Sequence, residues 1–228
     1  MPVARDMALT SGFPALSAVF SHRPAQAAGP FGGPDLSSLG DEALMQRWQN
    51  GDLRAFQALY RRNGASLHRY LLRMTRTQPE AEELFQDVWL AVVRAHGGWR
   101  PEASFRTFLF TIANRRLTDR LRKRSRRMGE IFAFPIEDAA DQLISSEPDP
   151  AAAADAADLG RALMVAIAAL PEAQRQAFLL QVEGGLSLEE IAEATGAPTE
   201  TVKSRLRYAR QRLREALGEY RPEDSGDD

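Results

Sequence analysis

Apolar residues recur every three or four positions from residue 41 to residue 127, the spacing that aligns side chains along one face of an α-helix. Leu44 and Trp48 begin this pattern, and Phe56 marks the next helix. We expect a third helix to start after Asn63-Gly64, a dipeptide that favours turns. The apolar residues that continue the pattern are Leu67, Leu71, Met74, Leu84, Val88 and Val92.

A loop separates the last two helices of this segment. Pro79 suits the first turn of a helix, and the glutamates after it lie near the positive end of the helix dipole. The run His96-Gly97-Gly98-Trp99-Arg100-Pro101 interrupts the apolar spacing and predicts the loop. A long basic helix is then expected from about Ser104 to Arg127.

The segment from Leu186 to Arg214 has the pattern of a helix-turn-helix. Ser187 and Glu190 form the S-x-x-E capping box that begins a short helix, and Gly196-Ala197-Pro198 ends it. Thr199 is expected to cap the second helix. Such a helix enters the major groove of DNA with its N-terminal residues at base edges, although a basic helix face is otherwise simply solvated. The candidate DNA-reading residues are Thr201, Lys203, Ser204, Arg205 and Arg207.

These patterns predict an all-α fold of two small helical domains joined by a flexible acidic linker. The N-terminal segment is rich in Ala, Pro, Gly and Ser, which is typical of disorder. The Ala-rich stretch Ala151–Ala157 is expected to begin the first helix of the second domain. The expected divisions are a disordered tail at 1–38, a first domain at 39–127, the linker at 128–158, a second domain at 159–218 and an acidic tail at 219–228.

The charge of the chain is segregated, although the net charge of its 228 residues is only −2. Arg100–Glu130 holds ten Lys/Arg and three Asp/Glu. Met128–Gly160 holds eight Asp/Glu and no Lys/Arg, and Lys203–Arg214 holds six basic residues and no acidic one. This order predicts two polyanion-binding surfaces joined by an acidic tether.

Several classes of function lack support in the composition. The chain has no cysteine, and its three histidines are too scattered in sequence to suggest a ligand cluster, so we expect neither disulfides nor a metal or other cofactor. No apolar run approaches the ~20 residues that span a bilayer. The weakly apolar stretch Phe13–Phe20, interrupted by a proline, does not favour a secretory signal. We therefore expect a cytoplasmic protein without membrane insertion and without catalytic activity, since no nucleophile–base pair is recognisable.

Several motifs together resemble the extracytoplasmic-function sigma factors, in the order of that family. The resemblance covers about residues 41–127 and 159–217. The segments that resemble region 4 of the family are Leu170-Pro171, Gly185-Leu186-Ser187 and Thr201–Leu206. Those that resemble region 2 are Asp41-Glu42 with Leu44, Gly51-Asp52 with Ala55-Phe56, Ala81–Trp89, Phe105–Leu109 with Ile112-Ala113, and Asp119 with Leu121-Arg122. The resemblance implies a subunit that binds core RNA polymerase and promoter DNA, with region 4 at the −35 element and region 2 at the −10 element.

The resemblance also implies roles for residues of the first domain. The polar face formed by Glu83, Gln86 and Asp87 would meet the polymerase, where an isolated helix would merely be solvated. The loop at Trp99 would capture a flipped −10 base, although Trp99 itself is equally consistent with a core position. The family commonly has Asn at the position of Arg115 and Trp at that of Phe108, so this chain departs at both. The candidate −10 residues are Trp99, Arg100, Asn114, Arg115, Arg116, Arg120, Arg122 and Lys123.

Two further expectations concern partners. Sigma factors of this type commonly have an anti-sigma partner that hides the DNA-binding and polymerase-binding surfaces, and the resemblance implies one here. The N-terminal tail is the alternative regulatory element, because a disordered segment can fold back on the domains. The alternative function is a two-domain helix-turn-helix regulator that does not bind polymerase stably. A region 2 with a polymerase-facing helix distinguishes the sigma factor from that regulator.

Overall fold

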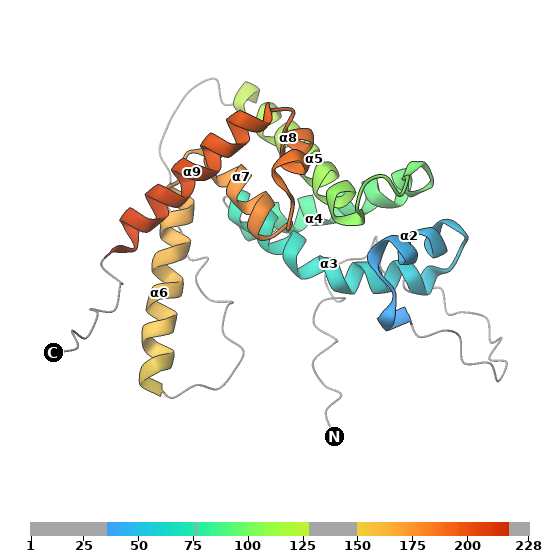
Figure 1. The fold of residues 1–228 in the computed structure, drawn as a ribbon, viewed down its shortest axis with the longest axis horizontal. Helices are drawn as coiled ribbons and strands as arrows, with labels where there is room; N and C mark the ends of the chain where they lie inside the picture. The colour runs from blue at the N-terminus through green and yellow to red at the C-terminus, as the bar shows by residue number, and fades with distance from the viewer. Residues whose placement is uncertain (1–35, 76, 128–149, 219–228) are drawn as a thin grey trace.

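The computed structural model describes residues 36–75, 77–127 and 150–218, and every regular element in these ranges is helical (Figure 1). This confirms the expected all-α fold. The expectations for residues 1–35, 128–149 and 219–228 lie outside the described residues. The elements are η1 (Leu36–Ser38), α2 (Asp41–Gln49), α3 (Leu53–Met74), α4 (Gln78–Ala95), η2 (His96–Gly98), α5 (Phe105–Arg127), α6 (Pro150–Ala169), α7 (Glu172–Val182), α8 (Leu188–Thr195) and α9 (Thr199–Ala216).

The first bundle, α2 to α5, packs around aromatic side chains. Phe56 lies between Trp48 and Trp89, with ring centroids 4.6 Å and 5.8 Å away. Tyr60 and Phe85 meet edge to face at 5.9 Å, an arrangement that aromatic rings favour. These contacts join α2, α3 and α4, so the helix that carries the expected polymerase-facing residues is held against the rest of the bundle.

The expected helix break at Asn63-Gly64 is wrong, because α3 runs from Leu53 to Met74 without interruption. The Asn63 side chain donates hydrogen bonds to Asp41 Oδ2 at 2.8 Å and to the Leu59 carbonyl at 3.1 Å. Its amide therefore supports the helix and ties it to α2. A helical Gly costs only ~1 kcal/mol relative to Ala, and the buried residues on either side of the pair outweigh that cost.

The second bundle, α6 to α9, contains the expected helix-turn-helix. Helix α6 begins at Pro150, where a proline suits the first helical position, so it includes residues that the expected division assigned to the linker. The Ala-rich stretch after Pro150 is helical, as expected. The expected cap at Thr199 is wrong: Pro198 is the last extended residue, with ψ 145°, and Thr199 already lies in the first turn of α9.

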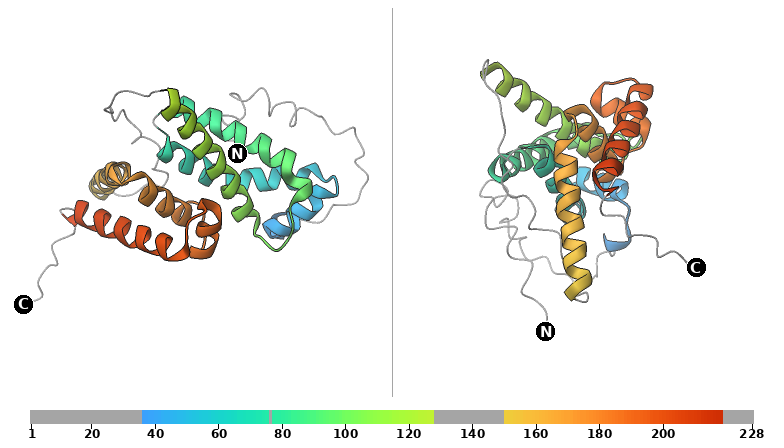
Figure 2. Two further views of the ribbon diagram at one scale, coloured as in Figure 1. Left: turned by 90° about the horizontal axis from the view of Figure 1, so that it is seen from above. Right: turned by 90° about the vertical axis from the view of Figure 1, so that its left-hand side faces the viewer.

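The two bundles lie side by side (Figure 2). Helix α5 packs against α8, and α3 packs against α7. Buried apolar residues of both bundles form a single contiguous cluster. The linker was expected to keep the domains flexibly joined, whereas in this structure they share an interface.

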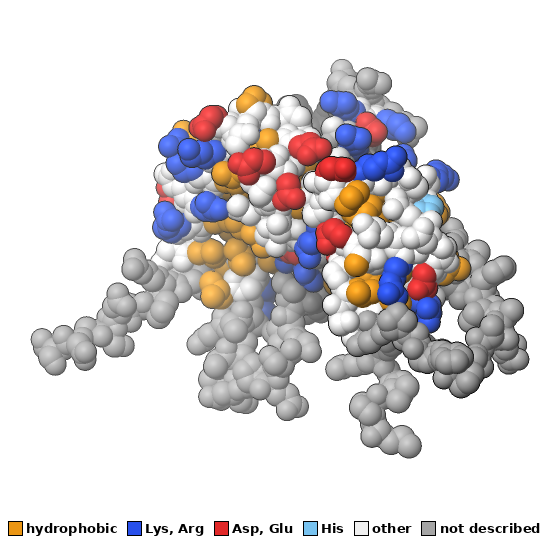
Figure 3. Space-filling view, turned by 45° about the vertical axis from the view of Figure 1, so that its right-hand side comes forward, with side chains coloured by type: hydrophobic (Ala, Val, Ile, Leu, Met, Phe, Trp, Pro, Cys, Tyr) orange, Lys and Arg blue, Asp and Glu red, His pale blue; other side chains and the backbone are white. Residues whose placement is uncertain are grey.

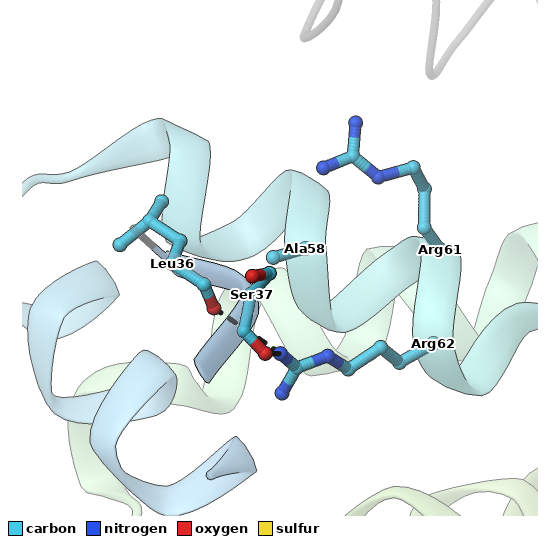
Figure 4. Close-up of a pocket in the computed structure, with 5 residues that line it drawn as sticks. All are labelled: Leu36, Ser37, Ala58, Arg61 and Arg62. Atoms are coloured by element: carbon cyan, nitrogen blue, oxygen red, sulfur yellow. Dashed lines mark hydrogen bonds between the residues drawn. The ribbon is translucent and has the colours of Figure 1, made fainter. Parts of the chain in front are cut away.

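A short segment before the first bundle is held by one arginine. Arg62 of α3 donates to the carbonyls of Leu36, Ser37 and Leu39 at 3.1, 2.7 and 2.5 Å, and to Asp41 Oδ1 at 3.1 Å. Figure 4 shows the guanidinium reaching the Leu36 and Ser37 carbonyls beside a surface hollow. The last residues of the predicted disordered tail are thus ordered against α3.

Candidate nucleic-acid interface

The turn between α8 and α9 is built by local hydrogen bonds and one left-handed glycine. Ser187 and Glu190 form the predicted reciprocal capping box: the Glu190 amide donates to Ser187 Oγ at 3.2 Å, and the Ser187 amide donates to Glu190 Oε2 at 2.8 Å. Gly196 ends α8 with φ 67°, a conformation that glycine adopts without steric cost. Buried Ile191, Val202 and Leu206 lie at the inner faces of the two helices. The geometry is that of a helix-turn-helix.

The expected DNA-reading residues share the first part of α9. The Lys203 and Arg207 side chains are exposed, whereas Thr201, Ser204 and Arg205 are half-buried. Ser204 Oγ donates to the Thr201 carbonyl at 2.9 Å and so is already bonded within the helix. In the described part of the chain, Arg205 makes no hydrogen bond or ion pair with another side chain. It therefore has its donors available for a base edge.

An aromatic neighbour of these residues has no counterpart in the sequence-based prediction. The Arg207 guanidinium lies 4.9 Å from the ring centroid of Tyr208 and donates to its hydroxyl at 3.2 Å. The Tyr208 side chain is 46% exposed. The sequence could have indicated this contact, because an Arg and a Tyr are adjacent on the outer face of a basic helix. Tyr208 holds Arg207 in a defined orientation on the surface.

The expected −10 residues of α5 fall into three environments. Asn114 is buried and Arg120 is paired with acidic side chains, whereas the others lie on the surface. In the view of Figure 3, the basic side chains gather in separate patches on the surface of the molecule. A polyanion would find only part of the predicted set accessible in this conformation. The exposed members are Arg115, Arg116, Arg122 and Lys123.

Arg120 joins the expected −10 surface to the expected polymerase surface. Its guanidinium lies 3.3 Å from Glu80 Oε1 and 2.5 Å from Glu83 Oε2. The hydrogen bond from Arg120 lowers the pKa of Glu83, so the carboxylate is held in its charged form. On α4, the helix that carries Glu83, Asp87 is exposed and Gln86 is half-buried. Glu83 and Asp87 are thus both exposed acids of α4, and Glu83 is the one paired with Arg120.

The loop at Trp99 is fastened to α2 through its backbone. Gln49 Nε2 donates to the carbonyls of His96 and Trp99 at 2.7 Å and 3.1 Å. The His96 ring stacks on Trp48 at 4.3 Å. The Trp99 side chain is only 4% exposed, so its indole packs in the core here, while Arg100 and the two glycines before Trp99 face solvent. Residue patterns gave no signal for Gln49, because its partners are backbone atoms about fifty residues away.

Asn114 lies at the contact between the two bundles. Its Oδ1 accepts hydrogen bonds from the Tyr70 hydroxyl at 3.2 Å and from Gln176 Nε2 at 2.6 Å. Its Nδ2 donates to the Ala194 carbonyl at 2.8 Å. The side chain is 4% exposed, and burial also raises the pKa of the Tyr70 hydroxyl, which stays protonated as a donor. In this arrangement Asn114 cannot reach nucleic acid.

Metal clusters and membrane spans are both absent from the described ranges. Within them, no three His, Asp or Glu side chains converge on a point where a metal ion could bind. No helix in the same ranges has the length and apolar character needed to cross a membrane.

Comparison with known proteins matches both bundles to one family. The family model for Sigma-70 region 2 matches residues 59–127, and the model for Sigma-70 region 4 matches residues 160–213. The chain is 31% identical to the ECF RNA polymerase sigma factor SigE of Mycolicibacterium smegmatis, over 85% of this chain and 70% of that one. It is 36% identical to the ECF RNA polymerase sigma factor RpoE of Cereibacter sphaeroides, over 73% of this chain and 88% of that one.

A solved structure shares the arrangement of helices. The sigma factor RpoE from Bartonella quintana, in complex with the anti-sigma factor NepR, matches with a TM-score of 0.57 and 25% identity. The match covers 72% of this chain and 96% of that one. With regions 2 and 4 on its two helical bundles, in that order, the chain belongs to the extracytoplasmic-function (ECF) RNA polymerase sigma factors and is an alternative sigma factor that directs transcription initiation.

Proposed function

We propose that the two bundles divide promoter recognition between them, with α9 reading the −35 element and α4, α5 and the Trp99 loop serving the −10 element and core polymerase. The observation that carries this proposal is the helix-turn-helix. Its second helix presents Lys203, Arg205 and Arg207 after a turn that the capping box of α8 and a left-handed glycine stabilise. A basic helix in the other bundle supplies the second polyanion surface. A protein with both surfaces can hold two separate elements of one promoter.

Co-purification with core polymerase, followed by run-off transcription on genomic promoters, tests this division. We expect a stable complex and transcripts that begin at a restricted set of promoters. Binding to promoter DNA without any association with polymerase would instead identify a helix-turn-helix regulator. The bond-forming chemistry belongs to the polymerase, so we propose a non-enzymatic role for this chain, in the cytoplasm where polymerase acts.

An anti-sigma factor is the regulatory partner that we propose. The Bartonella quintana relative was solved with such a partner, and that relative matches 72% of this chain. A partner of this kind controls a sigma factor by covering the surfaces that polymerase and DNA need. The same co-purification from cells would recover the partner in a fraction that lacks polymerase.

Reversing the charge of Glu83 and Asp87 together is expected to weaken the binding of core polymerase by at least about tenfold. Both acids lie on the outer face of α4, away from the buried stripe of Leu84 and Val88, so the helix should still fold. Affinity for core, measured by fluorescence anisotropy, checks the effect, and circular dichroism checks the fold.

The matched control is Glu102→Lys, which reverses an exposed charge in the loop before α5. It should bind core like the unaltered protein. A second control, Arg120→Gln, removes the partner of Glu83 without adding charge to α4. If the double reversal left core binding unchanged, the polymerase surface would have to lie elsewhere.

Gln49→Ala is expected to slow promoter opening by roughly five- to tenfold. The substitution removes two hydrogen bonds to the backbone of the loop, each worth about 0.5–1.5 kcal/mol, and leaves the loop side chains intact. A loop that is less well positioned captures an unpaired base less often. Opening is followed by the fluorescence of 2-aminopurine placed in the −10 element.

The control for this substitution is Gln46→Ala, at an exposed position one turn earlier on α2. It removes the same side chain without touching the loop. Affinity for core should be equal in both variants. Equal opening rates for Gln49→Ala and Gln46→Ala would show that the loop does not depend on the Gln49 contacts.

A further inference from the structure

The outer face of α9 lies opposite the stripe that this helix buries. The residues of the buried stripe are Val202, Leu206, Ala209 and Leu213. Because successive residues of an α-helix are about 100° apart, the side furthest from that stripe carries Ser204, Arg207, Tyr208 and Gln211. These four residues, which we call the reading strip, are spaced i, i+3, i+4 and i+7. A helix that lies in the major groove presents side chains to base edges at this spacing. The reading strip therefore includes an aromatic ring.

The two ends of the reading strip are bonded within the helix. Ser204 Oγ donates to a backbone carbonyl of the preceding turn at 2.9 Å, and Gln211 Nε2 donates to Glu215 Oε1 at 2.9 Å. The Ser204 side chain is also short. Arg207 and Tyr208, at the centre of the strip, are long and exposed. They are thus the members of the strip that reach furthest toward a partner.

The two central side chains hold each other in place. The Arg207 guanidinium lies 4.9 Å from the ring centroid of Tyr208 and donates to the Tyr208 hydroxyl at 3.2 Å. A cation near an aromatic ring is attracted by the electrons of the ring, and the hydrogen bond adds direction to that attraction. Side chains that are ordered before binding lose less conformational entropy when a partner arrives. The pair is therefore arranged before it meets DNA.

The geometry of a helix directs the Tyr208 ring toward the start of α9. Aromatic side chains in an α-helix point back over the preceding turn, because the remaining rotamer would clash with that turn. For Tyr208 this turn begins at Ser204, whose small side chain leaves space beside the ring. Tyr208 is 46% exposed. Its apolar surface is therefore available near the N-terminal half of α9, the part of a recognition helix that meets the bases.

The major groove offers such a ring one apolar group. Thymine carries a C5 methyl group there, whereas the other groups that identify the bases are hydrogen-bond donors and acceptors. A ring and a methyl group that come together both leave water, which is favourable. The Arg207 guanidinium, held beside the ring, matches the O6 and N7 acceptors of guanine. The pair is suited to a thymine with a guanine next to it.

We propose that Tyr208 determines part of the −35 specificity: its ring contacts the methyl group of a thymine in the −35 element, while Arg207 binds a neighbouring guanine. The proposal rests on the −35 function proposed for α9 and deepens it. A phosphate contact carries no sequence information, because phosphates are alike at every step of the duplex. A methyl contact favours only the sequences that have thymine at one position.

Replacing thymine by uracil tests the contact, because it removes the methyl group and keeps the base pair. The full chain, assembled with core polymerase, first selects its preferred −35 sequence from randomised duplexes. Each thymine of that sequence is then replaced singly by uracil. We expect one replacement to weaken binding about fourfold, the value of one buried methyl group. Tyr208→Ala should abolish the difference between the thymine and uracil duplexes, and Tyr208→Phe, which keeps the ring, should retain it.

Arg212→Ala is the matched control, because it truncates an exposed residue of α9 outside the reading strip. It should keep the fourfold difference between thymine and uracil. Circular dichroism verifies that each variant keeps its helix content. Affinity for core polymerase, measured separately, verifies that each variant assembles.

Three results would overturn the contact. The preferred −35 sequence could lack thymine or bind equally well with uracil, or the thymine–uracil difference could survive in Tyr208→Ala. Loss of core binding in Tyr208→Ala would place the ring against the polymerase instead of DNA. An assembled polymerase that selects no −35 sequence at all would contradict the function proposed for α9, and not the role of Tyr208 alone.

Discussion

Arg205→Ala is expected to weaken binding to the preferred −35 sequence by about 1–3 kcal/mol and to relax the preference at one or two base positions. Arg205 lies in the second turn of α9, where a recognition helix presents its side chains to base edges. Within the described residues no acidic group competes for its guanidinium. A bidentate contact with a guanine would be lost entirely on truncation, and Arg205→Lys should restore the charge without restoring the preference.

Arg212→Ala is the matched comparison for that experiment. Arg212 is exposed and lies near the end of the same helix, where contact with a phosphate or with nothing is expected. A binding selection on randomised −35 duplexes separates the two residues. Arg212→Ala should leave the selected sequences unchanged. If Arg205→Ala reduced binding equally on every sequence, Arg205 would be a phosphate contact and another side chain would read the bases.

Trp89→Ala is expected to destabilise the first bundle by about 3–5 kcal/mol, a large part of the 5–15 kcal/mol that usually separates a folded domain from its unfolded state. The Trp89 side chain is completely buried, and its ring meets Phe56, Tyr60 and Phe85. No neighbouring helix can fill the volume left by its removal without breaking those contacts. Unfolding by urea, followed by circular dichroism, measures the loss.

Trp89→Phe provides the comparison. It keeps an aromatic ring in the cluster and removes an indole N–H that is buried without a hydrogen-bond partner among the described residues. We expect it to cost less than half as much as Trp89→Ala, because the missing volume is smaller and an unsatisfied donor is lost. Equal losses for the two substitutions would show that the indole makes a contribution that ring packing does not explain.

The parts of the fold that could be predicted from the sequence are those fixed by neighbours along the chain. The capping box of Ser187 and Glu190 and the left-handed turn at Gly196 depend on residues within a few positions of each other, and both are present. The cap expected at Thr199 rests on the same kind of local signal and is wrong, because Pro198 already supplies the last extended residue. Local signals thus place a helix more reliably than they place its first residue.

The candidate site could be predicted only where its residues lie on one helix. The α9 set lies together, as its spacing indicated. Asn114 and Trp99 are buried for reasons that no local pattern contains, since their partners include Ala194 and Gln49, 80 and 50 residues away. The break expected at Asn63-Gly64 failed in the same way, because Asp41 on another helix satisfies the amide. Tertiary contacts decide such positions, and residue spacing does not reveal them.

Arg62 places an unusual evolutionary demand on the chain. Three of the four oxygens that its guanidinium contacts are backbone carbonyls of Leu36, Ser37 and Leu39, which any amino acid at those positions would also supply. Substitutions in this segment therefore leave these three hydrogen bonds possible, provided that the arginine stays. Natural selection can therefore act on one codon in α3 to keep the backbone of this segment in place, while the apolar side chains of Leu36 and Leu39 are under a separate demand, since they pack against the hydrophobic core.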